Sequence, residues 1–551
     1  MIPRLPLLPF ESLMRLNLAA LMIFAFAGSS ELAASEVMEL AKRIDDHINH
    51  RLAEENVQPT ELVDAAGFLR RVTLDLAGRI PSTSELDAYL SADAKERKQQ
   101  LVQRLIESPD FAYHQRNQLD ILLLLRQEHN DQWREYLLEA TRENRSWDQL
   151  FREVILPEDT LSTDPRPVAF LKRRTNDLDA MTNDTSVTWF GVNIACAKCH
   201  DHPLVSDWTQ AHYYGMSAFF KRTFQTRQGF LSERFDGTTK YTNTDGEEHE
   251  ADFMFLTGTK VDVPALEIDE EELKKLNEQI KTSESDEKAD SPPRPEFRPR
   301  AYLVQLALAD EENDFFTRNI ANRVWARLFG RGIVHPLDQM HSENAPSHPE
   351  LLSELASDLR ESGYDLRRLI HAIVLTDAYA RSMMRDSVAK AIGEASFAAA
   401  VPRPLSPRQL SLSLRIAGTG PDTLTQWQSD DWAKRRDELE RQADVTARRL
   451  AIPDDGFQVS VSEALWFSNN PSIENDFLNG SNDCLVGHLK QIESNEEVAD
   501  VVSKAVLSRQ ASDDERQAIA DYLNARSERR ENGLKQVVWA LMSSPEFRFN
   551  Y

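Results

Sequence analysis

The chain is 551 residues long and carries a net charge of −26 at pH 7, with 41% hydrophobic and 28% charged residues. This length exceeds one ordinary hydrophobic core and predicts two or three domains, and the composition is that of a globular protein rather than a disordered or membrane-embedded one. The negative charge argues against nucleic acid and anionic membrane surfaces as partners, because an acidic field repels phosphate groups.

The first 34 residues have the layout of a secretory signal peptide. Arg15 precedes an apolar run that extends to about Ala27, and possible cleavage points follow Ala27 and Ala34. The alternative is an uncleaved membrane anchor, but the run is short for a full bilayer span. We therefore expect a periplasmic, secreted or cell-surface protein with no transmembrane span in its mature chain.

The next part of the chain reads as a helical domain, residues 37–222. From Val37 to about Leu156 the apolar residues recur at spacings of three and four, as on one face of a helix. A further helix is expected from about Asn183 to Lys198.

Residues 223–296 change character. β-branched and aromatic residues alternate there with Gly and Asp turns, which predicts a few short strands. An acidic run and a Pro-rich stretch follow, and they are typical of a solvated helix and a linker. We expect a domain boundary near residue 296.

The second half, residues 297–551, is helical again. Ser347 and Glu350 form a capping-box pair before one apolar stripe, Gly363 ends that helix, and Asp365 can cap the next one. The predicted fold class is mainly α: two helical domains, with a small β-rich insertion and an acidic, Pro-rich linker between them.

Four residues with metal-binding side chains lie within a span of seven: Cys196, Cys199, His200 and His202, in a chain with one other cysteine, Cys484. Covalent attachment of haem c requires two thiols about one helical turn apart and a histidine directly after the second thiol, which becomes the proximal ligand of the iron. The first three residues have this spacing, and export allows such attachment.

The same residues also allow two other sites. Cys196 and Cys199, with two of His200, His202 and His212, would make a set of ligands suited to tetrahedral zinc or a similar metal. A disulfide between the two cysteines for thiol exchange is a third alternative. It usually opens a helix after a strand, whereas here a helix is expected to precede the cysteines.

If haem is present, a sixth iron ligand decides between electron transfer and binding of small molecules. The candidates are His212 and Met216 in one stretch and Met340 and His341 in another, and nothing in their spacing ties them to the iron. Several nearby aromatic residues either wall the porphyrin or form ordinary core, the latter being the default. They are Trp189, Phe190, Trp208, Tyr213, Tyr214, Phe219 and Phe220.

A basic segment extends from Phe316 to Val334, with arginines at 318, 323, 327 and 331 around two aromatic residues. It is either a docking or anion-binding face, or an amphipathic helix with salt-bridged arginines, and the second is the commoner case.

Several long motifs resemble one grouping of proteins. The stretches FLRRVTLDLAGRIPSTSEL (68–86) and WFGVNIACAKCHDHPLVSDWTQAHYYGMSAFF (189–220) resemble the planctomycete cytochrome-c-like domain of the second type. The stretch that begins FTRNIANRVWARLFGRGIVHPLDQMHSENAPSHPELL (316–352) is similar to the planctomycete surface domain that usually follows it, and LMSSPEFRF (541–549) fits the end of that domain.

The resemblance implies an exported protein that is cytochrome-like on its C-x-x-C-H motif, in families whose biochemical role is largely uncharacterised. By position, it implies that Cys196 and Cys199 carry the thioether bonds and that His200 is the proximal ligand. This chain departs from the pattern at residues 339–341, Gln-Met-His, where relatives tend to have an aromatic residue followed by Gly.

Two functions stay open on the sequence. The first is a secreted protein with c-type haem that acts in electron transfer or haem redox chemistry and meets a redox partner protein. The second is an extracytoplasmic structural or interaction protein, within an extracytoplasmic assembly, whose Cys/His cluster binds zinc or another metal or only stabilises the fold.

Overall fold

The computed structural model describes residues 34–124, 130–160, 164–265, 267–383, 394–425, 431–450 and 461–551. These residues are mainly helical, which confirms the predicted fold class. The predicted signal peptide lies outside the described residues, apart from residue 34. Among the residues that the structure describes, no helix has the length and apolar character needed to cross a membrane.

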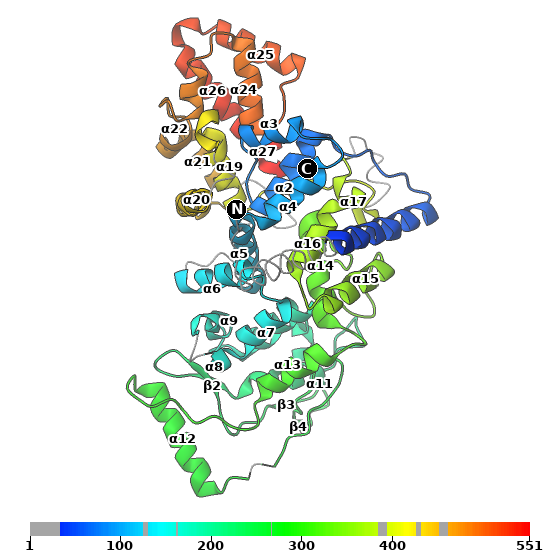
Figure 1. The fold of residues 1–551 in the computed structure, drawn as a ribbon. Coiled ribbons are helices and arrows are strands. Elements are labelled where there is room, and N and C mark those ends of the chain that lie inside the picture. Colours follow the sequence, from blue (N-terminus) through cyan, green and yellow to red (C-terminus); the bar gives the residue numbers. More distant parts are fainter. Residues whose placement is uncertain are drawn as a thin grey trace, which may run out of the picture.

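The first part of the chain is a succession of helices (Figure 1). After a helix at residues 34–54 come α2 (Ala65–Ala77), α3 (Thr83–Ser91), α4 (Arg97–Glu107), α5 (Pro109–Leu124), α6 (Asp131–Arg142), α7 (Trp147–Ile155), α8 (Pro157–Thr160), η1 (Arg166–Val168), α9 (Ala169–Lys172), α10 (Leu178–Thr185), η2 (Ser186–Phe190), η3 (Ala195–Lys198) and α11 (Gln210–Lys221).

The predicted short strands and the acidic helix are both present between these helices and the second half. The elements are β1 (Thr223–Gln225), β2 (Leu231–Glu233), β3 (Lys240–Thr242), β4 (Glu248–Glu250) and α12 (Glu270–Ser285). Two antiparallel hairpins result, β1 with β2 and β3 with β4. Helix α12 buries only Ile280 and Ser283, so it is the solvated helix that its charge predicts.

The second half is again a succession of helices. It comprises α13 (Pro299–Ala309), α14 (Phe315–Phe329), α15 (Pro349–Glu361), α16 (Leu366–Leu375), α17 (Asp377–Ala380), η4 (Glu394–Ser396), β5 (Arg403–Pro404), α19 (Pro407–Gly418), η5 (Pro421–Leu424), α20 (Trp432–Ala447), α21 (Val461–Asn469), α22 (Pro471–Phe477), α23 (Leu485–Leu489), α24 (Asn495–Leu507), α25 (Asp513–Asn524), η6 (Ser527–Arg529), α26 (Arg530–Met542), α27 (Pro545–Arg548) and β6 (Phe549–Asn550).

Helix starts follow local signals in most places, with one correction. Asp365 caps α16 by accepting a hydrogen bond from the backbone N–H of Arg368 at 3.0 Å, as predicted. The predicted capping box of Ser347 and Glu350 is wrong, because α15 begins one residue later, with His348 at the N-cap. The Ser347 hydroxyl donates instead to the carbonyl of Ile333 at 3.2 Å, so a tertiary contact has replaced the local cap.

The apolar core forms two main clusters. The larger one extends from Val37 to Ala398, so it takes side chains from both sides of the expected boundary near residue 296. The smaller one extends from Leu405 to Phe547 and also includes Leu74 and Ile80 from the first part of the chain. Figure 1 shows helices α21–α26 at one end of the molecule, α12 and the β3–β4 hairpin at the other, and α2–α6 with α14–α17 between them.

Candidate functional site around Cys196, Cys199 and His200

The helix before the cysteines is shorter than predicted. Helix α10 continues into one π-helical turn, η2, and stops at Gly191, which has φ +69°. A Cβ atom at this position would lie 2.7 Å from Oδ1 of Asn319, so both the left-handed backbone and the close approach favour glycine. The predicted continuous helix to Lys198 is therefore wrong: Cys196 lies on a separate 3-10 turn, η3, and Cys199 is the residue directly after it.

Both cysteines of the motif are exposed free thiols, three residues apart across η3. None of the chain's cysteines, all of which lie in the described residues, is in a disulfide. His200 follows directly and is also exposed. Two exposed thiols followed by an imidazole are the groups that covalent haem attachment requires.

The hydrogen bond of His200 fixes which ring nitrogen is available to a metal. Nδ1 lies 2.7 Å from the backbone carbonyl oxygen of Asp201. A carbonyl oxygen can only accept, so Nδ1 carries the proton and donates it. The remaining nitrogen, Nε2, then has a free lone pair, which is the arrangement that orients metal-binding histidines.

Contacts from α10 and α11 hold the turn in place. Asp179 of α10 forms an ion pair with Lys198 and accepts a hydrogen bond from the Tyr213 hydroxyl at 2.6 Å. These two donors hold the pKa of Asp179 below its usual value, with Lys198 the larger cause. The carbonyl of Lys198 accepts from the Tyr214 hydroxyl at 3.2 Å, and Asp201 accepts from the backbone N–H of Gln210 at 2.8 Å.

A segment of the second half, residues 337–344, is hydrogen-bonded to the same loop. Val192 pairs with Gln339 in an antiparallel bridge, and the backbone N–H of Asn193 donates to the carbonyl of Asp338 at 2.8 Å. The carboxylate of Asp207 accepts from both the backbone N–H and the hydroxyl of Ser342, at 2.9 and 2.6 Å. Residues far apart in the sequence thus build one site.

This contact brings two of the candidate sixth ligands beside the motif. The backbone N–H of Met340 donates to the carbonyl of Gly191 at 3.0 Å, and the Met340 side chain is buried. His341 is half-buried, and its Nδ1 has no hydrogen-bond partner among the described residues. Burial lowers the pKa of His341; Asp207 opposes this shift, and His202 adds to it.

The other predicted ligands have structural partners. The Nδ1 of His202 accepts from the backbone N–H of Leu204 at 3.3 Å. His212 completes the N-cap of α11, with Nδ1 2.9 Å from the Thr209 hydroxyl oxygen, and burial lowers its pKa against the opposing charges of two aspartates. Met216 is fully buried in the larger cluster and is not brought to the motif's surface.

Within the part of the chain that the structure describes, no three His, Cys, Asp or Glu side chains lie together in a way that could hold a metal ion. The zinc alternative, like the haem itself, stays a prediction.

Most of the candidate aromatic wall is ordinary core, since all its members except Tyr214 are buried in the larger cluster. Tyr214 instead begins a stack of half-exposed aromatic rings that the sequence did not reveal. Its ring stacks on Tyr241 with centroids 4.2 Å apart, and Tyr241 stacks on His249 at 5.4 Å. Tyr241 and His249 face each other across β3 and β4, so recognising them required the register of that hairpin.

Comparisons with known proteins give two family matches. Residues 43–225 match the family PSCyt2, protein of unknown function (DUF1549), and residues 299–453 match PSD1, protein of unknown function (DUF1553). No curated protein and no solved structure matches the chain. The two matches are consistent with a planctomycete cytochrome-c-like domain followed by a planctomycete surface domain.

Proposed function

We propose that this chain is an extracytoplasmic c-type haem protein, with thioether bonds at Cys196 and Cys199 and His200 as the proximal ligand of the iron. The observation that carries the proposal is the hydrogen bond from His200 Nδ1 to the carbonyl of Asp201, directly after two exposed thiols, one on the 3-10 turn η3 and one at its C-terminal end. It supports a role in electron transfer or haem redox chemistry.

The contacts of the loop indicate what the protein itself contributes to such a site. Haem bound here would supply one-electron chemistry. The two thiols tether the group, and the carbonyl of Asp201 orients the imidazole of His200. The Lys198–Asp179 pair and the bond from Asn193 to Asp338 restrain both sides of the turn, which limits reorganisation of the loop around the iron.

The visible spectrum tests the proposal. We expect that protein produced with a cytochrome c maturation system has a Soret band and a redox-sensitive α-band, and that both survive denaturation because the haem is covalently held. The double variant Cys196→Ala/Cys199→Ala should lose the bands. The matched control is Cys484→Ala, which removes the half-buried cysteine outside the motif and should leave the spectrum unchanged.

A colourless protein from the same host would contradict the proposal. If that protein carried stoichiometric zinc, lost in the double variant, the alternative function would hold: an extracytoplasmic structural or interaction protein braced by a metal.

A further inference from the structure

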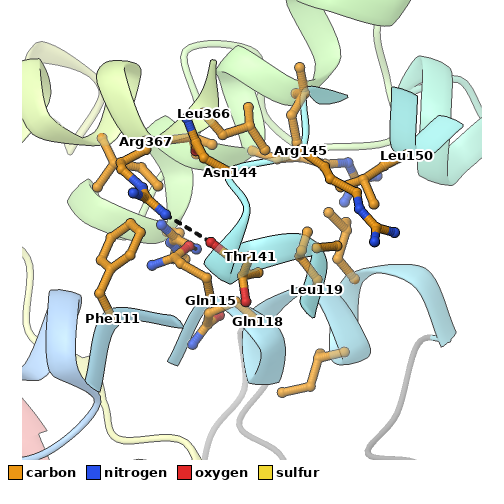
Figure 2. Close-up of a pocket in the computed structure, with 18 of the residues that line it drawn as sticks. Phe111, Gln115, Gln118, Leu119, Thr141, Asn144, Arg145, Leu150, Leu366 and Arg367 are labelled. Carbon is orange, nitrogen blue, oxygen red and sulfur yellow. Dashed lines mark hydrogen bonds between the residues drawn. The ribbon is translucent and has the colours of Figure 1, made fainter. Parts of the chain in front are cut away.

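A second site lies in a cavity of about 350 Å³, lined by residues of α5, α6, α14 and α16 (Figure 2). None of residues 191–212, which form the cysteine loop and the start of α11, lines it. Its volume is within the range of small-molecule binding sites. The cavity therefore excludes the cysteine loop and adjoins the candidate haem site only at Leu337.

The described residues of the lining combine an apolar wall with positive charge. Phe111, Leu119, Ile320 and Ile370 are among its apolar members. Every charged residue among the described ones that line it is an arginine, namely Arg145, Arg323, Arg327 and Arg367. Such a lining is unexpected in a chain of net charge −26, where carboxylates are plentiful.

Among the described residues, only Arg145 of these four arginines forms a direct ion pair. Arg145 pairs with Glu143 at 2.8 Å and with Glu153 at 3.2 Å. The other three make no ion pair with a described residue. Burial lowers the pKa of each, and more distant carboxylates, Asp338, Asp75 and Asp365, only partly oppose this shift. The three guanidinium groups are half-buried, so a bound anion would provide the direct counter-charge that the described residues do not.

The three arginines without an ion pair have neutral partners, and two of them, Arg327 and Arg367, keep donors without a partner among the described residues. Arg327 Nη1 donates to Gln115 Oε1 at 2.9 Å, while its Nε and Nη2 are buried without a partner among the described residues. Arg367 Nη2 donates to the Thr141 carbonyl at 2.8 Å, the dashed bond in Figure 2, and its Nε is likewise unpartnered. Arg323 donates to Asn319 Oδ1 at 2.9 Å and to the Val187 carbonyl at 2.6 Å.

Gln115 adds an independent sign of a missing acceptor. Its side chain is only 7% exposed, yet its Nε2 has no hydrogen-bond partner in the described structure. Buried donors of this kind are nearly always satisfied in folded proteins. A ligand oxygen that accepts from Arg327 could also accept from the neighbouring Nε2 of Gln115, since the two side chains are already hydrogen-bonded to each other.

We infer that this cavity binds a small organic anion, with an acidic head group that accepts from Arg327, Arg367 and Gln115 and an apolar body that lies against Phe111 and Ile320. Planar guanidinium groups match the oxygens of a carboxylate in two-point hydrogen bonds. The apolar wall excludes a bare inorganic ion as the best ligand, because such an ion leaves that wall without contacts.

Octanoate is the probe for a calorimetric titration of the full chain, and octanol is its uncharged counterpart. We expect octanoate to bind and octanol to bind at least tenfold more weakly. Arg327→Met should weaken octanoate binding by about 10- to 100-fold, the range for a hydrogen bond to a charged group. Arg367→Met tests the second arginine that is proposed to bind the head group. It keeps the proposal testable if Arg327→Met does not fold.

Two controls separate a ligand site from a structural role. Arg318→Met changes an arginine of the same helix, α14, that does not line the cavity, and it should leave octanoate binding unchanged. Without octanoate, Arg367→Met should stay folded with an unfolding temperature close to that of the parent, because the half-buried guanidinium that it removes makes no ion pair with a described residue. Absence of octanoate binding, equal affinity for octanol, or unaltered binding by the two variants would overturn the inference.

Discussion

At the scale of single residues, Gly191 decides where the cysteines lie. It ends the π-helical turn η2 in a left-handed conformation, and the space beside its Cα is filled by Asn319 of α14. Asn319 is itself held by a hydrogen bond from its Nδ2 to the Thr188 carbonyl at 2.8 Å. Gly191 therefore both ends the helix and allows the close approach of Asn319 from the second half of the chain.

Gly191→Ala should destabilise the protein more than the same change elsewhere. The left-handed conformation costs an alanine about 1–2 kcal/mol, and the contact with Asn319 adds to this cost. Gly363→Ala is the matched control, since Gly363 also has φ +69° but has no atom within 4 Å of the new Cβ. We expect the apparent Tm to fall in both variants and to fall further in Gly191→Ala. Equal decreases in Tm would show that Asn319 moves away from the new Cβ at no cost in stability.

At the scale of elements, η3 is a short turn that depends on its neighbours. Its own hydrogen bonding is slight: the backbone N–H of Ala197 donates to the Ile194 carbonyl at 3.0 Å. Helices α10 and α11 supply the rest through Asp179, Tyr213 and Tyr214. A four-residue turn cannot be stable alone, because helix formation requires more residues than this to offset nucleation.

Asp179→Ala should loosen this turn without unfolding the molecule. It removes an exposed ion pair and a hydrogen bond from Tyr213 to a charged group, together worth about 2 kcal/mol. Hydrogen exchange measured by mass spectrometry on a peptide that covers residues 194–200 should become roughly tenfold faster or more. Asp513→Ala, which breaks the exposed pair with Arg516 on α25, is the control and should leave that peptide unchanged. Unchanged exchange in Asp179→Ala would contradict this account.

At the scale of the whole molecule, buried charges connect the first helices to the smaller cluster. Asp110 of α5 accepts from Arg79 at 2.7 Å and from the indole N–H of Trp432 at 3.1 Å, and Arg436 of α20 lies 2.6 Å from it. Burial alone would raise the pKa of Glu85, but Arg79 lowers it to about 2. This carboxylate stays charged in the folded protein, and the stability that it contributes is lost only as the pH falls from about 4 towards 2.

Asp110→Asn should be strongly destabilising, because it leaves two fully buried arginines, Arg79 and Arg436, short of negative charge. Removing one partner of a buried ion pair costs about 3–5 kcal/mol. Asp87→Asn is the matched control: its exposed pair with Lys504, at 3.0 Å, joins the same two parts of the chain and should be worth less than about 1 kcal/mol. Calorimetric unfolding measures both. A similar Tm for the two variants would show that the buried ion pairs are not what couples these two parts of the chain.

Several features followed from the sequence alone, because they depend on neighbours along the chain. The helical periodicity, the short strands after Lys221, the solvated acidic helix and the cap at Asp365 are all present in the structure. Each arises from spacing or from local hydrogen bonding within a few residues. The C-x-x-C-H spacing is read directly from the sequence, whereas the exposure of the two thiols and of His200 is seen only in the structure.

Only the tertiary structure decided what surrounds those local features. The end of the helix at Gly191 depends on Asn319, and the place of Met340 and His341 beside the motif depends on pairing between segments about 145 residues apart. The basic segment gave no sign of which arginines would lack carboxylates, since that follows from how α5, α6, α14 and α16 pack around one cavity. Sequence spacing fixes what a residue can reach along its own helix, whereas burial and counter-charge are set by residues that only folding brings near.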